Sequence, residues 1–125
     1  MSKLPEKIKK AWDEREGALV LTTVNEKGIP NAVYVLSVAL YGDNMIVVAD
    51  NYFDKTRHNI LHGSTGSILF MGPNRKAYQA KGKLEYYTDG PIFDDMKKWN
   101  PEKHPGHAAL ALVVEEVYSG AERIF

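Results

Sequence analysis

Short turns between β-rich segments constrain the fold of this 125-residue chain more than any other feature of its sequence. Residues 18–24 are mostly apolar or β-branched, and the turn at 25–28 ends in a glycine. A second extended segment, 30–41, leads through Gly42, Asp43 and Asn44 into the apolar run 45–50. Because turns this short join antiparallel neighbours, we expect the first three strands to form a meander.

The rest of the sequence predicts three further strands and three helices. The strands are expected at 66–71, 76–87 and 108–118, and the helices at 4–16, at 55–62 and from Pro91 onward. Six short antiparallel strands with two to three short helices are typical of a mainly β, Greek-key split barrel. We expect residues 1–125 to form this barrel as a single domain.

Two predicted strands are apolar on both faces, at residues 33–40 and 108–114. In an antiparallel sheet one face normally meets water, so something must cover the second face. The first and third helices are one possible cover, and a two-fold symmetric homodimer is the other. We expect the homodimer, and on this interpretation a charge at Val35 or Leu112 should dissociate it.

Composition excludes several classes of function. Sixteen basic residues balance sixteen acidic ones, which gives no field that would recruit nucleic acid or a membrane surface. The absence of cysteine excludes disulfides and thiolate chemistry. The first residues lack the apolar core of a signal peptide, so we expect a cytoplasmic protein. His58 and His62 are four residues apart but lack the glutamate of the zinc-protease motif, so no metal ligands are predicted.

The segment after the third strand has the features of an anion site. Asp54 is a good helix N-cap residue, and Lys55, Thr56 and Arg57 would fill the first helical turn. Unpaired backbone N–H groups, two cations and a hydroxyl suit a phosphate monoester. The alternative is a capped surface helix whose cations face water.

In this context the chain resembles the FMN-binding split-barrel proteins of the pyridoxamine 5′-phosphate oxidase-like superfamily. The resemblance rests on the order of elements, on the Lys-Thr-Arg-His-Asn step at 55–59 and on the Thr-Asp-Gly-Pro helix start at 88–91. Small FMN-binding members of similar length are the most alike. The resemblance implies FMN as cofactor, bound at the interface of a homodimer.

The resemblance also implies roles for particular residues. Lys55 and Thr56 would hold the phosphate, whereas Arg57 could equally point outward. The end of the third strand would run beside the ribityl chain and ring, and the second strand would meet the ring edge through backbone groups. These two segments contribute Ala49, Asp50 and Asn51, and Tyr34, Val35 and Leu36.

Four more residues are candidates on weaker grounds. Gln79 and Lys81 lie on the polar face of the fifth strand and could reach the phosphate or the neighbouring subunit. Trp99 and Phe125 could cover the flavin from the partner chain. Equally, Trp99 could be helix core and Phe125 a frayed end.

The expected function is that of a small oxidoreductase or electron carrier that uses FMN. No catalytic residue is predicted, because a flavin itself carries the redox chemistry. Oxidation of pyridoxamine phosphate and degradation of haem are not expected, since residues 123–125 supply a single cation and no longer C-terminal segment. The alternatives are an F420-binding reductase and a non-enzymatic FMN-binding or sensory module.

Overall fold

The computed structural model describes residues 3–125, which form eight strands, three α-helices and one 3₁₀ helix. The strands are β1 (Glu16–Val24), β2 (Pro30–Val35), β3 (Val38–Tyr41), β4 (Met45–Asp50), β5 (Gly66–Met71), β6 (Ala77–Tyr87), β7 (Ala108–Ser119) and β8 (Glu122–Arg123). The helices are α1 (Glu6–Asp13), α2 (Lys55–Leu61), the 3₁₀ helix η1 (Pro73–Arg75) and α3 (Pro91–Trp99). None of the described helices has the length and hydropathy needed to cross a bilayer.

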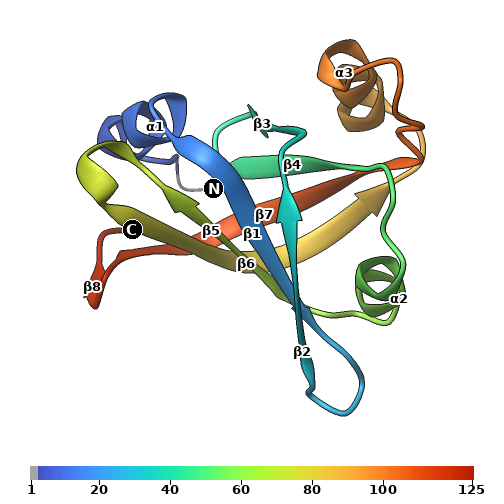
Figure 1. Ribbon diagram of the computed structural model, residues 1–125, viewed down its shortest axis with the longest axis horizontal. Coiled ribbons are helices and arrows are strands. Elements are labelled where there is room, and N and C mark those ends of the chain that lie inside the picture. The colour runs from blue at the N-terminus through green and yellow to red at the C-terminus, as the bar shows by residue number, and fades with distance from the viewer. Residues whose placement is uncertain (1–2) are drawn as a thin grey trace.

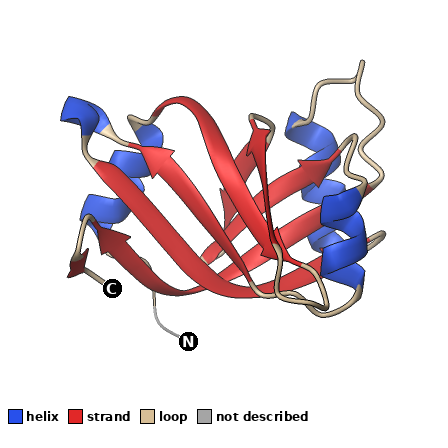
Figure 2. Ribbon diagram, turned by 60° about the horizontal axis from the view of Figure 1, so that its bottom comes forward, coloured by secondary structure: helices blue, strands red, loops and turns tan. Residues whose placement is uncertain are grey.

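All the described strands belong to one antiparallel sheet with the order β2-β1-β5-β6-β7-β4-β3, and β8 pairs with β7. The sheet curls on itself, so that β2 and β3 lie at its two edges (Figure 2). The predicted mainly β split barrel is therefore confirmed. The split is the gap in strand pairing between β2 and β3, although these strands are consecutive in the chain.

The strand predicted at 30–41 is two strands, because the chain crosses from one edge of the sheet to the other at residues 36–37. The Ser37 hydroxyl donates a hydrogen bond to Asn100 (2.6 Å), and the Ser37 carbonyl accepts one from the Ala49 N–H (3.0 Å). These contacts fix the crossing against β4 and the end of α3. The division of the predicted strand 30–41 into β2 and β3, together with the short β8, gives eight strands where six were predicted.

A β-bulge helps the sheet to curl. The pairing of β6 with β7 shifts register between Lys81 and Gly82. A Cβ atom added at Gly82 would lie only 1.8 Å from the Val113 carbonyl oxygen. Glycine allows this close approach of the two backbones, and bulges of this kind bend the strand that carries them.

The main core fills the interior of the barrel. Leu21 of β1, Ile68 of β5 and Leu112 of β7 are completely buried there. Helix α1 adds Trp12, whose ring meets Phe70 edge-on at 5.3 Å between centroids. Helix α1 lies at one end of the barrel, whereas α2 and α3 lie at the other (Figure 1).

A second, smaller core lies between α3 and the outer faces of β4 and β7. Its fully buried members are Met96 of α3 and Ala109 and Ala111 of β7. The second apolar face of β7 is thus covered by a helix of the same chain and needs no subunit interface. Val35 (7% exposed) and Leu112 (fully buried) both belong to the main core, so a charge at either would disrupt the barrel and would not report on a dimer.

Candidate functional site

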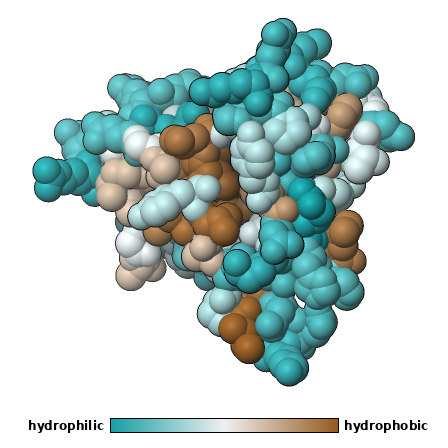
Figure 3. Space-filling view, turned by 45° about the vertical axis from the view of Figure 1, so that its right-hand side comes forward, coloured by the Kyte–Doolittle hydropathy of each residue, from teal (hydrophilic) through white to brown (hydrophobic). Residues whose placement is uncertain are grey.

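A cavity of about 700 Å³ lies where the barrel is split. Its walls come from β2 and the crossing to β3, from the end of β4 and the start of α2, and from the end of α3 with the loop behind it. Figure 3 shows the face that carries α2 and α3, with a hydrophobic area bordered by hydrophilic side chains. The volume is within the range of small-molecule sites.

One end of the cavity carries a cation and a buried hydroxyl. Lys55 is exposed at the start of α2 and has no ion-pair partner within residues 3–125. Thr56 is 2% exposed, and its hydroxyl oxygen accepts a hydrogen bond from the Asn31 side-chain amide (3.0 Å). The hydroxyl hydrogen of Thr56 is therefore left to donate to a ligand. Asp54 takes the predicted N-cap position without a side-chain capping bond.

Buried Asp50 forms an ion pair with the partly exposed Arg57 behind this end of the cavity. Asp50 is completely buried and accepts two hydrogen bonds from Arg57, from Nε (2.7 Å) and Nη2 (2.9 Å). The Phe53 N–H donates to the same carboxylate (3.1 Å), as does the Tyr86 hydroxyl. The hydrogen bond to Asp50 holds the pKa of Arg57 above its usual range. Burial, together with the bond to Asp50, raises the pKa of Tyr86 to about 12.

This geometry assigns Asp50 and Arg57 a positioning role. Neither residue lines the cavity, and their bidentate pair ties the end of β4 to the first turn of α2. Lys55 and Thr56 lie in that turn, so the ion pair fixes where they stand. The sequence correctly predicted that Arg57 lies in the first turn of α2, but it could not show that the guanidinium of Arg57 bonds to Asp50.

Two asparagines hold the opposite wall. The Asn51 and Asn100 side-chain amides donate to one another (3.0 and 2.9 Å), and Asn51 also accepts from the Gly106 N–H (2.9 Å). Asn100 is 7% exposed and also receives the Ser37 hydroxyl bond. This network places the loop after α3 beside the end of β4 and beside the crossing between β2 and β3.

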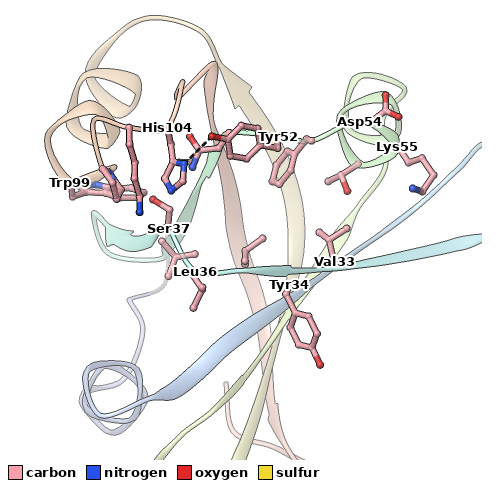
Figure 4. A pocket seen from close by; sticks show the side chains of 17 residues that line it. Val33, Tyr34, Leu36, Ser37, Tyr52, Asp54, Lys55, Trp99 and His104 are labelled. Carbon is pink, nitrogen blue, oxygen red and sulfur yellow. Dashed lines mark hydrogen bonds between the residues drawn. The ribbon is translucent and has the colours of Figure 1, made fainter.

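The far end of the cavity is aromatic. Figure 4 shows Trp99 and His104 at the opposite side from Lys55. The Tyr52 hydroxyl lies 3.0 Å from His104 Nδ1, with the two rings nearly perpendicular. Trp99 is half-buried, and its indole N–H donates to Asp95 (3.2 Å). It is thus both part of the smaller core and a wall of the cavity of its own chain.

The structure brings eight of the thirteen predicted site residues to this cavity. They are Tyr34, Val35, Leu36, Ala49, Asn51, Lys55, Thr56 and Trp99. Figure 4 shows the Tyr34 side chain pointing away from the cavity, so Tyr34 contributes mainly backbone. Lining residues that the sequence analysis missed include Ser37, Tyr52, Lys103 and His104. No local signal pointed to Lys103 and His104, because the Asn51–Asn100 contact that places their loop joins residues 49 apart.

Five predicted residues do not line the cavity within one chain: Asp50, Arg57, Gln79, Lys81 and Phe125. Lys81 lines a separate hollow near Gly66 and Gly82, and its ammonium lies 5.1 Å from the centroid of the Tyr118 ring. Phe125 packs against the main core, and its backbone pairs with Val117. The chain end is thus hydrogen-bonded to β7, and Gln79 of β6 pairs with Leu69 of β5 and Tyr118 of β7.

A split barrel with a ligand-sized cavity at the split defines a class of small-molecule-binding β proteins. The sequence matches the family described as Pyridoxamine 5′-phosphate oxidase over residues 4–120, and the chain belongs to that family.

The chain is also similar to other known proteins. The chain is 27% identical over 123 residues to an uncharacterized protein of Methanocaldococcus jannaschii, covering 94% of this chain and 80% of the relative. HupZ of Group A Streptococcus is 25% identical, with a TM-score of 0.79 and 93% of each chain covered. An FMN-binding protein from Syntrophomonas wolfei is 20% identical, with a TM-score of 0.78 over 94% of this chain and 88% of that one, which shows the shared fold.

Proposed function

We propose that this protein binds FMN in the cavity at the split and acts as a small oxidoreductase or electron carrier. The observation that carries the proposal is the arrangement of the cavity, which has Lys55 and the buried Thr56 hydroxyl at one end and the aromatic side chain of Trp99, beside His104 and Lys103, at the other. FMN has the matching polarity, with a phosphate joined by a ribityl chain to an aromatic ring system. Membership of the family supports the same ligand.

The phosphate would lie against the first turn of α2. Lys55 offers a charge that no carboxylate of the described chain neutralises, and Thr56 offers a donor that Asn31 keeps oriented. Such charge-assisted hydrogen bonds are the strong ones in phosphate recognition. Arg57 is not needed as a ligand, since its Nε and Nη2 both bond to Asp50.

The ring system would lie against the split edge of the sheet. In the described chain β2 pairs only with β1, so backbone groups on its other edge are left for a ligand. Such N–H and C=O groups can bond to the pyrimidine end of a flavin. Val35 and Val38 provide apolar surface beside them, and Trp99 provides an aromatic wall.

A second copy of the chain would complete the site. Leu36, which lines the cavity, is 73% exposed, and Tyr34 beside it is 80% exposed. Large apolar side chains next to a cavity are typical of surfaces that a partner covers. We propose a homodimer in which β2 and the crossing to β3 lie at the interface and the ring is shielded from water between subunits.

Bound FMN would supply the electron or hydride transfer, and the side chains of this protein would bind it, orient it and limit access of water. No general base is required of the chain for that role. Turnover of NADH or NADPH with an added acceptor would separate an oxidoreductase from a sensory module, in which FMN binds but no turnover occurs.

The direct test is titration of ligand-free protein with FMN, followed by fluorescence and by the mass of the complex. Lys55→Ala should weaken FMN binding by about 1.5–3 kcal/mol, the usual contribution of a charge-assisted contact. Lys83→Ala, at an exposed lysine on β6, is the matched control and should bind as the wild type does. The proposal fails if the wild type ignores FMN, or if F420 binds in its place.

A further inference from the structure

Glu26, His58 and His62 form a cluster on the surface outside the cavity. Glu26 lies in the turn between β1 and β2, whereas the two histidines lie on and just after α2. One potential ligand atom from each residue lies within 4.8 Å of the other two. We propose that these three side chains bind a divalent transition-metal ion, of which zinc fits the donors best.

The fold brings the donor atoms close to one another. His58 Nε2 lies 2.8 Å from a carboxylate oxygen of Glu26, in a hydrogen bond that a bound ion would replace. His58 and His62 are one helical turn apart, and their ring centroids are separated by 4.1 Å with planes tilted by 32°. All three side chains are exposed, so an ion reaches them without any movement of the backbone.

Further hydrogen bonds orient His62 and the turn that carries Glu26. His62 Nδ1 lies 2.8 Å from the His58 carbonyl oxygen, to which it can only donate, so its proton is on Nδ1 and Nε2 is left as a ligand. Metal-binding histidines are commonly oriented by such a bond. The Asn25 side chain accepts from the N–H groups of Lys27 and Ile29 (2.9 Å each), which orders the turn that carries Glu26.

The donor set selects the class of metal. Two imidazole nitrogens and one carboxylate oxygen are the ligands of several zinc sites that keep a fourth position for water. Calcium and magnesium prefer oxygen ligands throughout, so they fit this cluster poorly. No metal ligands were predicted from the sequence, where His58 and His62 lack the glutamate of the zinc-protease motif. The third donor, Glu26, lies 32 residues before His58, and no sequence motif connects the two.

A bound ion would join the β1–β2 turn to α2. The turn leads into β2, which lines the cavity through Val33 to Val35, and α2 lines it through Lys55 and Thr56. Metal binding should therefore stabilise the protein against unfolding, since the ion binds the folded arrangement of three separated side chains. The inference does not depend on the proposed FMN site.

The test is calorimetric titration of chelator-treated protein with zinc chloride, with thermal unfolding as a second readout. We expect one ion per chain, a higher melting temperature with zinc, and weaker zinc binding on acidification because imidazole must be neutral to bind. Glu26→Gln and His62→Ala should each weaken zinc binding by at least about tenfold, as expected when one of three ligands is lost. His107→Ala, at an exposed histidine outside both the cluster and the cavity, is the matched control and should bind zinc as the wild type does.

Three results would overturn the proposal. One is zinc binding by a His58→Ala, His62→Ala double variant that equals the wild type. Another is full affinity in Glu26→Gln, which would leave only a histidine pair. The third is one ion per two chains with a matching rise in mass, which would place the metal between molecules. Circular dichroism of each variant in chelator confirms that the substitutions leave the fold unchanged.

Discussion

Strands β7 and β2 belong to segments with the same sequence pattern, apolar on both faces, but they differ in burial. Both faces of β7 are covered, whereas one face of β2 is exposed. In β7 the leucines 110 and 112 fill the barrel, and the alanines 109 and 111 are buried under α3. In β2 and the residue after it, Val35 faces the core, whereas Tyr34 and Leu36 remain 80% and 73% exposed.

The difference lies in the size of the outward-facing residues. Alanines on the outer face of β7 let α3 approach closely, so that Met96 is completely buried against the strand. Tyr34 and Leu36 are large, lie beside the split and have no helix over them (Figures 1 and 4). The small outward residues of β7 are thus covered by a helix of the same chain. The large outward residues of β2 are left available to a ligand or a second subunit.

The largest effect should come from placing a charge on each strand. Ala111→Asp would bury a carboxylate under α3 without a partner, and we expect a loss of at least about 3 kcal/mol in the free energy of unfolding. Ala32→Asp makes the same change at an exposed position of β2 and should cost the folded monomer no more than about 0.5 kcal/mol, apart from any effect on the proposed dimer. Urea unfolding measures both, and equal losses would remove the distinction between the strands.

The next effect compares two neighbouring cations, Arg57, which is paired with Asp50, and Lys55, which has no ion-pair partner among the described residues. Arg57→Ala leaves Asp50 buried without its bidentate partner and should lower the free energy of unfolding by about 2 kcal/mol. Lys55→Ala should leave unfolding nearly unchanged and act on FMN binding. If chemical denaturation finds Arg57→Ala as stable as the wild type, the ion pair does not fix the start of α2.

Leu36→Asp tests the open strand itself. The exposed position should tolerate the change in the folded monomer, but a charge there should dissociate the proposed dimer and weaken FMN binding by at least about tenfold. Leu69→Asp, at a 42% exposed leucine of β5 that does not line the cavity, is the matched control. Sedimentation gives the oligomeric state of both variants, and FMN titration gives their affinities. If Leu36→Asp stays dimeric, the proposed interface is wrong.

The last effect, confined to alkaline pH, is a pH dependence at Tyr86. Its pKa is raised from 10.0 to about 12 in the folded protein, so the folded state holds the phenol proton more tightly than the unfolded state does. This contribution to stability is complete below pH 10 and is lost as pH rises toward 12. Tyr86→Phe should unfold with a shallower pH dependence over that range, which urea unfolding of both proteins at several alkaline pH values would measure.

Local sequence patterns predicted the strands, the helices and the Lys55–Thr56 end of the cavity, because turn residues, periodicity and helix-start residues are local signals. Contacts between distant segments were beyond those patterns. The break at residues 36–37 depends on Ser37 meeting Asn100, and the aromatic end depends on Asn100 meeting Asn51. The cover over β7 could have been anticipated from its outward alanines.

The most direct test of the proposed site compares FMN with riboflavin, which lacks the phosphate, on the wild type and on Lys55→Ala. Equilibrium fluorescence titrations give the four dissociation constants. We expect the wild type to prefer FMN by at least about tenfold and the variant to lose most of that preference, since in the proposed site only the phosphate meets Lys55. A preference that is the same in both proteins would place the phosphate elsewhere and contradict the account.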